Sequence, residues 1–548
     1  MRTRSLTTSI LCSLALAAVG TESIAQQRLR PRPQPAATAQ PAPPTVAAPA
    51  APAAPAATPA ATPPATAGVA EEGRMARIRF WAAVTLLALA GCSATSHSAL
   101  PNPVTAAVTS RDAARESILH FFSGRPDGAW PNSGRLVADR AGNLYGATIM
   151  GGLGSCRFRG MARGCGVVFE LIRGQRGQWS ERVLYNFKSL EEGAVPRSSL
   201  TIDPNGNIYG VTVAGGNHGC APRIWNQRGC GTVFELTRGH SNFKKRTIYV
   251  FSGNAGGGHP TSSLVLDSSG NLFGTTLCGG AESCNGVGAG AGVFFMLQQN
   301  GSGAWQENVL HIFGQTRGDG AYPGGDLTRK GTQTIYGVTA ASVYEMTRTR
   351  KSQWRETTLF LFNPDESGGF SPEGAPVFDA AGNLYGVTYG GGNLACPQGC
   401  GVVYELTPWG SGTWSETVLY EFSGGSDGAY PEAGLAMDAA GRLDRTTING
   451  GDLRCNQPLG CGVVFRVRPS GTRSVETVLH SFQGGATDGW LPLSAVTLDS
   501  AGAIYGTTQF GGPASGFANG TAYRLKACTS MNTSFTAGNR LRMALSIL

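Results

Sequence analysis

The sequence is poor in charged residues. Only 14% of its 548 residues are Asp, Glu, Lys or Arg, and no run of basic residues is interleaved with aromatic side chains. The formal net charge of +9 is unevenly placed, because residues 1–100 hold eight Arg and three Glu and so carry +5 of it. Nucleic-acid-binding proteins concentrate positive charge on one surface. We therefore expect no nucleic-acid partner.

Long apolar runs and familiar catalytic motifs are also missing. The apolar run at residues 80–91 is well short of the roughly 20 residues that a membrane-spanning helix needs. No His-Glu-x-x-His motif and no phosphate-binding Gly-rich loop occurs in the repeated part of the chain. The sequence therefore predicts neither a transmembrane helix nor a metalloprotease or nucleotide-binding site.

Two export signals lie in series near the start of the chain. Residues 1–25 place Arg2 and Arg4 before an apolar stretch, a pattern typical of a secretory signal. Residues 26–74 are rich in Pro and Ala and are expected to form a disordered, extended linker.

The second signal occupies residues 75–92. It ends in Leu-Ala-Gly-Cys92, which resembles a bacterial lipobox and implies lipidation of Cys92, with residues 93–115 as a tether. Two interpretations stay open. Translation starts either at Met1 or at Met75, and in the second case residues 1–74 are an upstream extension.

What the sequence has in excess is glycine, 79 residues of 548, and much of it belongs to a repeat. The clearest copy is DAAGNLYGVT at residues 379–388. Asp is suited to cap a tight turn, Gly to close it, and the apolar run that follows to form a half-buried strand. Capping, rather than calcium binding, explains the six turn residues Asp139, Asp203, Asp267, Asp379, Asp438 and Asp499.

Residues 116–527 divide into seven such units, each with four short strands. Repeated four-stranded units are typical of an all-β, seven-bladed β-propeller. The array starts with a fourth-strand sequence, SILHFF at residue 117, and ends with a third-strand sequence, GTAYRLKA at residue 520. We therefore expect the N-terminal strand to pair with the last blade and close the ring, and we expect residues 528–548 to be a disordered tail. The fourth and sixth units depart from the pattern, and we expect both blades to persist, the sixth locally weaker.

The pattern DxxGNLYGTT, a Gly-Gly pair, GxVFEL and ETVLYSF resembles the bacterial choice-of-anchor tandem-repeat family known as GloVer repeats. The resemblance covers residues 116–527, about three quarters of the chain. Members of that family differ in their surface anchor, which fits a lipobox. The resemblance implies no established activity and adds no catalytic residue.

Ten of the 13 cysteines fall in pairs in the loops between the second and third strands of a blade. In an exported chain such pairs indicate local disulfides, and zinc binding is the less favoured alternative. The pairs are Cys156 with Cys165, Cys220 with Cys230, Cys278 with Cys284, Cys396 with Cys400, and Cys455 with Cys461. The state of Cys528 is open.

An acid-Gly-aromatic-Pro segment precedes the first strand of most blades. Strand alternation places it on the same face as the cysteine loops, which we call the loop face. Its candidate binding residues are Trp130, Tyr322, Phe370, Tyr430, Trp490, Asp127, Asp319, Asp427 and Asp488, with His259 beside them. Packing of each blade against the next is the alternative, and we favour it. His120, His311 and His480 are expected to be ordinary strand residues.

The sequence therefore predicts a surface-anchored, non-catalytic binding or scaffold module for polysaccharide or protein. The alternative is an extracellular glycan lyase or hydrolase that uses acids on the loop face, but acids that recur nearly once per blade favour binding. We expect no cofactor, no metal and a monomer. We expect an outer-membrane or cell-surface lipoprotein, or otherwise a periplasmic or secreted protein.

Overall fold

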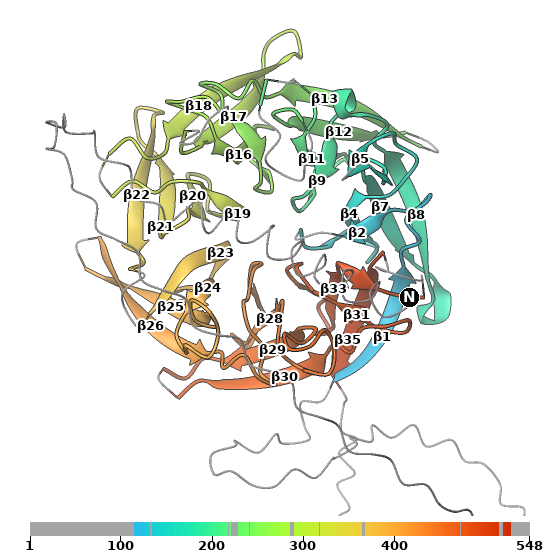
Figure 1. Ribbon diagram of the computed structural model, residues 1–548. Helices are drawn as coiled ribbons and strands as arrows, with labels where there is room; N and C mark the ends of the chain where they lie inside the picture. The colour runs from blue at the N-terminus through green and yellow to red at the C-terminus, as the bar shows by residue number, and fades with distance from the viewer. Residues whose placement is uncertain are drawn as a thin grey trace, which may run out of the picture. The chain divides into compact units, whose positions relative to one another are not determined.

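A computed structural model describes residues 114–527 except 132–133, 159–160, 217–218, 221–227, 240–241, 285–289, 317, 364–367, 411, 472 and 514–518. Seven antiparallel sheets follow one another around a ring (Figure 1). The predicted seven-bladed β-propeller is thus confirmed. None of the described residues belongs to a helix long and apolar enough to cross a membrane. The expected signals, linker, tether up to residue 113, Cys92 and tail lie outside the described residues.

Each blade runs from an innermost first strand to an outermost fourth strand. In blade 1 the first strand is split into β2 and β3, which both pair with β4. Blade 1 consists of β2 (Ala129–Pro131), β3 (Val137–Ala138), β4 (Leu144–Met150), β7 (Val167–Arg173) and β8 (Trp179–Asn186), with the hairpin β5 (Arg157–Phe158) and β6 (Met161–Ala162) in its second-to-third loop. Blade 2 consists of β9 (Ala194–Pro196), β10 (Thr201–Ile202), β11 (Ile208–Ala214), β12 (Thr232–Arg238) and β13 (Phe243–Val250). Two short 3-10 helices, η1 (Gln175–Gly177) and η2 (Leu190–Glu192), flank β8.

The next three blades repeat this order. Blade 3 consists of β14 (Gly258–Pro260), β15 (Val265–Leu266), β16 (Leu272–Cys278), β17 (Val293–Gln299) and β18 (Trp305–Ile312). Blade 4 consists of β19 (Gly324–Lys330), β20 (Thr334–Val338), β21 (Ser342–Arg348) and β22 (Trp354–Leu361). Blade 5 consists of β23 (Gly369–Phe378), β24 (Leu384–Gly391), β25 (Val402–Trp409) and β26 (Thr413–Glu421).

The last two blades complete the ring. Blade 6 consists of β27 (Ala436–Met437), β28 (Leu443–Thr447), β29 (Val463–Arg468) and β30 (Val475–Ser481). Blade 7 consists of β31 (Gly489–Trp490), β32 (Thr497–Leu498), β33 (Ile504–Thr508), β34 (Phe510–Gly511), β35 (Thr521–Ala527) and β1 (Ala114–Phe121).

The N-terminal strand β1 closes the ring, as predicted. It pairs antiparallel with β35, from Ala114 opposite Ala527 to Phe121 opposite Thr521, so the first described strand is the fourth strand of the last blade (Figure 1). The strand begins two residues before the predicted start at Glu116. β1 thereby covers the edge of β35 that blade 7 would otherwise expose.

The turn between the first and second strands behaves as predicted from its Asp. The Asp379 carboxylate accepts hydrogen bonds from the backbone N–H groups of Gly382 (2.7 Å) and Asn383 (2.8 Å). Tyr385 then donates its hydroxyl to Asp379 (3.2 Å) and to Glu405 on the third strand (2.9 Å). These bonds satisfy the turn and attach it to the sheet, so capping accounts for this residue.

The core lies between blades, in the form of one aromatic pair at each of the seven seams. A Phe directly after each fourth strand meets the aromatic ring of the next blade's third strand edge-to-face, with centroids 4.9–5.2 Å apart. The pairs are Phe122–Phe169, Phe187–Phe234, Phe251–Phe295, Phe313–Tyr344, Phe362–Tyr404, Phe422–Phe465 and Phe482–Tyr523. Phe122 closes the series, because it follows β1.

A second contact at the seams involves Pro and Gly. A Cβ atom placed on Gly401 would lie 2.7 Å from Cδ of Pro431 in the next blade, so no larger residue fits there. The residue before that Pro, Tyr430, has φ +56° and donates its N–H to the carbonyl of Cys400 (2.9 Å). Each blade holds one non-Gly residue in this left-handed conformation directly before a Pro: Trp130, Val195, His259, Tyr322, Ser371, Tyr430 and Leu491. The predicted packing role of the aromatic-Pro segment thus has a geometric basis.

The sixth blade keeps its fold although only one of its departures from the repeat is compensated: the side-chain nitrogens of Arg445 are buried with no hydrogen-bond partner in the described part of the chain. Asp444 stands where other blades have Tyr or Phe, and it forms a buried bidentate ion pair with Arg466, at 2.6 and 2.7 Å. Arg445 occupies a position that is Gly in the other blades and is fully buried. Burial lowers the pKa of Arg445 to about 9. The fourth blade also persists, although its second-to-third loop is nearly absent.

Candidate functional site

The loop face is built by the first strand of each blade. In blade 1, Ala129 pairs with Met150 and Pro131 pairs with Thr148, so the acid-Gly-aromatic-Pro segment enters the sheet where the second strand ends. The loop between the second and third strands starts at the same place. The two kinds of segment that sequence reasoning assigned to one face therefore lie together there.

The four Asp candidates on this face already accept hydrogen bonds from their own segments. Asp127 accepts from the N–H and hydroxyl of Ser123, at 2.9 and 2.6 Å, and Asp427 accepts from the corresponding groups of Ser423, at 2.8 and 2.5 Å. Asp319 accepts from the N–H of Gln315 (3.1 Å) and Asp488 from that of Gln483 (2.7 Å). The carboxylates thus hold the connection between blades in shape.

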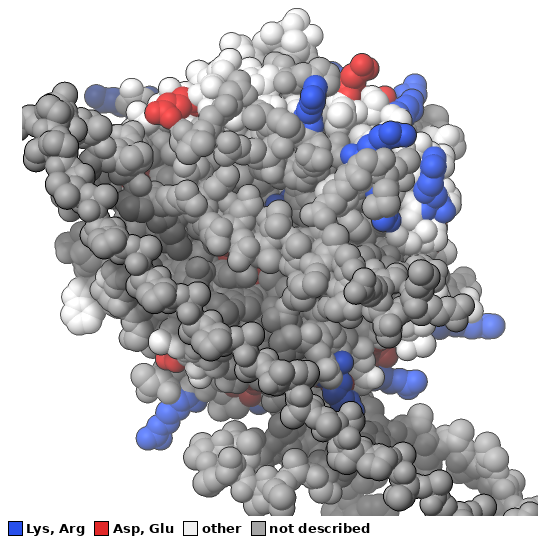
Figure 2. All heavy atoms as spheres, viewed as in Figure 1, with Lys and Arg blue, Asp and Glu red and all other residues white. Residues whose placement is uncertain are grey.

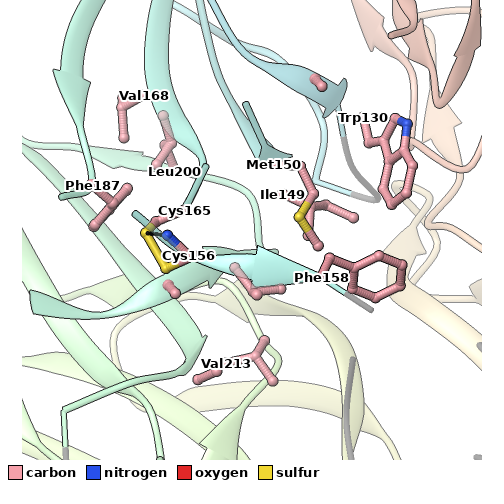
Figure 3. Close-up of a cluster of buried hydrophobic side chains, with 14 of the residues drawn as sticks. Trp130, Ile149, Met150, Cys156, Phe158, Cys165, Val168, Phe187, Leu200 and Val213 are labelled. Atoms are coloured by element: carbon pink, nitrogen blue, oxygen red, sulfur yellow. Dashed lines mark hydrogen bonds between the residues drawn. A yellow bond between two sulfur atoms is a disulfide. The ribbon is translucent and has the colours of Figure 1, made fainter. Parts of the chain in front are cut away.

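The aromatic candidates differ in accessibility. Trp130 is buried, and its ring packs edge-to-face against Phe158 and Phe510, with centroids 5.7 Å from each. Figure 3 shows Trp130 and Phe158 beside Ile149 and Met150 in the buried cluster next to the Cys156–Cys165 disulfide. Tyr322, Phe370, Tyr430 and Trp490 are half-buried. Tyr430 stacks on Tyr389 with ring centroids 4.8 Å apart.

Two of the candidates occupy a different register from the others. In blades 5 and 7 the left-handed residue before Pro is Ser371 or Leu491, and the aromatic residue stands one position earlier, as Phe370 or Trp490. Side chains alternate along a strand, so these two rings project to the opposite side from Trp130. His259 is buried, donates a hydrogen bond from Nδ1 to the carbonyl of Val213 (2.8 Å), and has a pKa lowered by burial.

The second-to-third loops carry disulfides and exposed leucines. The structure joins the ten cysteines in the five expected pairs. Beside three of the disulfides a leucine side chain is exposed: Leu394 at 83%, Leu153 at 61% and Leu453 at 44%. A loop fixed by a disulfide presents such a side chain at low entropic cost on binding. These leucines were not singled out in the sequence; an apolar residue within a Gly-rich loop was the available signal.

The outer edge of the seams holds a second set of polar groups that sequence reasoning missed. In four blades a His or Tyr of the fourth strand lies beside the Asp of the following segment and interacts with a Glu from the next fourth strand. His120 lies 2.9 Å from Asp127, and His311 lies 3.0 Å from Asp319. Two such groups, Glu116 with His480 and Asp488, and His311 with Asp319 and Glu356, place their ligand atoms within 4.8 Å of one another. The available signal was a Glu four residues before the His or Tyr in five of the fourth strands.

The Glu residues of these seams are partly desolvated. Burial raises the pKa of Glu181 and of Glu307 to about 7, and it raises that of Glu476, with help from the nearby Asp427, to about 8. The surface side chains visible in Figure 2 include Lys and Arg around the edge of the view, with some Asp and Glu among them. Acids with raised pKa values therefore lie between blades rather than on the loop face.

Fold and loop face together define a seven-bladed β-propeller with a candidate binding surface. Residues 107–346, 220–457 and 340–540 each match the model of the Gloeobacter/Verrucomicrobia repeat. Because these segments span most of the chain, the protein belongs to the Gloeobacter/Verrucomicrobia repeat family. No curated protein matches the sequence.

Several solved structures have a similar fold at low identity. A streptogramin B lyase is 13% identical with a TM-score of 0.43, covering 76% of this chain and 99% of the lyase. Virginiamycin B lyase from Staphylococcus aureus is 12% identical with a TM-score of 0.43, covering 75% and 98%. The polysaccharide lyase Uly1 is 11% identical with a TM-score of 0.39, covering 77% and 98%. At these TM-scores and identities the likeness assigns no activity.

The raised pKa of Glu476 makes stability depend on pH. Below about pH 4.5 the carboxyl is protonated in both folded and unfolded chains; as pH rises toward 8 only the unfolded chain releases its proton, so folding loses stability. Glu476→Gln should therefore raise the free energy of unfolding at pH 8 by roughly 2–4 kcal/mol and leave it unchanged at pH 4. Urea unfolding at the two pH values measures this. The exposed Glu421→Gln is the control, and an equal gain at both pH values would contradict the prediction.

Proposed function

We propose that this protein is an exported, surface-anchored binding or scaffold module whose loop face docks a polysaccharide or a protein. The proposal rests on a difference between two sets of side chains on that face. The recurring Asp residues are engaged in their own segments, whereas Leu394, Leu153 and Leu453 are exposed on loops held by disulfides. Exposed apolar side chains on a rigid frame favour docking over acid–base chemistry.

Two further features support this assignment. The five disulfides indicate an oxidising, extracytoplasmic environment, as expected for an exported chain. The rings of Tyr322, Phe370, Tyr430 and Trp490 are half-buried and so keep part of their apolar surface accessible. A glycan lyase or hydrolase is the alternative. It would need at least one loop-face Asp that is free of the hydrogen bonds to its own segment.

Glycan binding tests the docking role. The purified mature protein should bind saturably to at least one polysaccharide on a glycan array, without releasing reducing sugar from it. The double variant Leu394→Ser/Leu453→Ser should weaken that binding about tenfold or more, equivalent to about 1.4 kcal/mol. Trp409→Ser is the matched control, because Trp409 is 74% exposed but lies at the end of a third strand, on the opposite face. Turnover without saturable binding, or equal loss in the control, would contradict the role.

The lipid anchor is tested separately. If residues 75–92 are processed as a lipoprotein signal, the mature chain in the membrane fraction begins at Cys92 and carries the added mass of its acyl chains. Intact-mass analysis of that fraction measures both properties, and Cys92→Ser should release the protein from the membrane. A mature chain that starts elsewhere or lacks lipid mass would overturn the anchor but leave the docking role standing.

A further inference from the structure

We propose that Glu116, His480 and Asp488 form a binding site for a divalent transition metal, best suited to Zn²⁺, at the seam between blades 6 and 7. The three side chains come from different elements. Glu116 lies on the closing strand β1, His480 on β30, and Asp488 directly before β31. An ion held by all three would tie the closing strand to the neighbouring blade.

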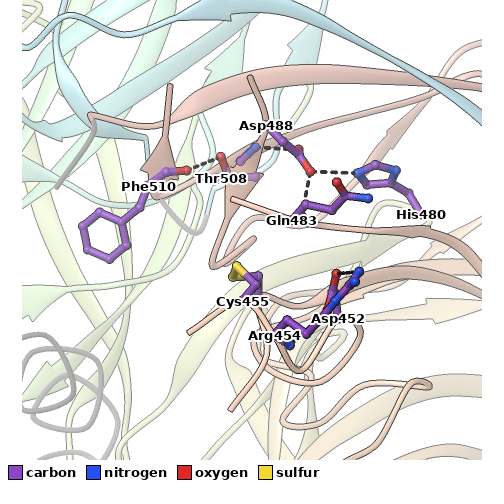
Figure 4. The surroundings of a disulfide bond; sticks show 10 residues. Asp452, Arg454, Cys455, His480, Gln483, Asp488, Thr508 and Phe510 are labelled. Carbon is purple, nitrogen blue, oxygen red and sulfur yellow. Dashed lines mark hydrogen bonds and ion pairs between the residues drawn. A yellow bond between two sulfur atoms is a disulfide. The ribbon is translucent and has the colours of Figure 1, made fainter. Parts of the chain in front are cut away.

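The distances fit a small ion better than a hydrogen-bonded cluster. His480 Nε2 lies 3.5 Å from Glu116 Oε2 and 3.7 Å from Asp488 Oδ2. Zinc takes N and O ligands at about 2.0–2.2 Å, so two ligands of a tetrahedral site stand roughly 3.3–3.6 Å apart. Figure 4 shows the His480 ring directed at the Asp488 carboxylate. A contraction of a few tenths of an ångström would bring the atoms into coordination.

One of the ligand atoms lacks a hydrogen-bond partner. His480 Nε2 is a buried atom for which no such partner exists within the described part of the chain, and the second carboxylate oxygen of Glu116, Oε1, is likewise unpaired. Leaving a buried polar atom unpaired costs about 1–3 kcal/mol, so a bound cation would remove this cost by giving the atom a partner. The side chains of Glu116, His480 and Asp488 keep 16%, 17% and 11% exposure, which leaves an open edge for a water ligand.

The other His seams are closed by hydrogen bonds and provide a comparison within the same molecule. His311 Nε2 bonds Asp319 Oδ1 at 3.0 Å, and His120 Nε2 bonds Asp127 Oδ2 at 2.9 Å. The Asp488 carboxylate accepts a hydrogen bond from the N–H of Gln483, which stands five residues before it in the sequence. At Asp127 and Asp319 the corresponding donor stands four residues before the Asp. That extra residue accompanies the longer separation from the imidazole.

The bonds on Asp488 suit a metal ligand. Gln483 N–H donates to Oδ2 at 2.7 Å and Gly489 N–H donates to Oδ1 at 2.5 Å, so the carboxylate is oriented before an ion arrives. Such outer contacts fix metal-binding carboxylates and imidazoles in their productive orientation. One imidazole and two carboxylates favour Zn²⁺ over Ca²⁺, which takes oxygen ligands.

Metal titration of the intact, disulfide-bonded protein tests the site. After chelator treatment and removal of the chelator, isothermal titration with Zn²⁺ should show one site per chain, and Zn²⁺ should slow amide hydrogen exchange in β1. His480→Tyr installs the residue found at the equivalent position of β26, Tyr420, and should keep the fold while weakening Zn²⁺ binding at least tenfold. Glu116→Gln should do the same.

His311→Ala is the matched control and should bind Zn²⁺ as the unaltered protein does. The proposal is overturned if the unaltered protein binds no Zn²⁺, if His480→Tyr and Glu116→Gln bind it equally well, or if His311→Ala loses it to the same extent. It is also overturned if Zn²⁺ binds but exchange in β1 does not change. Should His480→Tyr fail to fold, Glu116→Gln decides alone.

Discussion

The ring depends on an edge-to-face aromatic contact that occurs once at each seam. The Phe after every fourth strand packs against the third-strand aromatic ring of the next blade at nearly the same centroid distance, 4.9–5.2 Å. Each contact contributes about 0.5–1.5 kcal/mol beyond its buried area. No blade has a complete core of its own, so each blade is stable only between two neighbours. This requirement explains why the chain returns its first strand to its last blade.

At each seam one residue on the loop face has a strained backbone conformation. Seven non-Gly residues, one per blade, adopt a left-handed conformation before a Pro, at a cost of order 1–3 kcal/mol each. Val195 is the least suited of them, because it is β-branched. The cost is offset where the N–H of the residue bonds the preceding blade, as Val195 does to the Cys165 carbonyl at 3.2 Å. The strained positions therefore serve assembly, and the exposed leucines on the adjacent loops are left for partners.

Local pattern predicted most of the fold. The turn at Asp379, the strand order within a blade, ring closure and the five cysteine pairs all depend on residues near one another in sequence or on the repeat itself. What could not be predicted depends on contacts between blades, such as the pairing of His480 with Glu116, which are 364 residues apart in number, or on paired departures from the repeat within one blade, as in the Asp444–Arg466 pair. The register difference at Phe370 and Trp490 was visible in the sequence, where Ser371 and Leu491 stand between the aromatic residue and the Pro, but its meaning depends on the left-handed conformation before the Pro.

The central claim is that the ring is closed by seven equivalent seams, and the closing seam tests it most directly. Phe122 is the seam residue that follows β1, and Phe313 is its counterpart between blades 3 and 4; they are 2% and 0% exposed. Urea unfolding of Phe122→Ala and Phe313→Ala measures the two seams against each other. If the ring is closed as described, both substitutions lower the free energy of unfolding by a similar amount, about 3–5 kcal/mol. A normal loss for Phe313→Ala with no loss for Phe122→Ala would contradict closure.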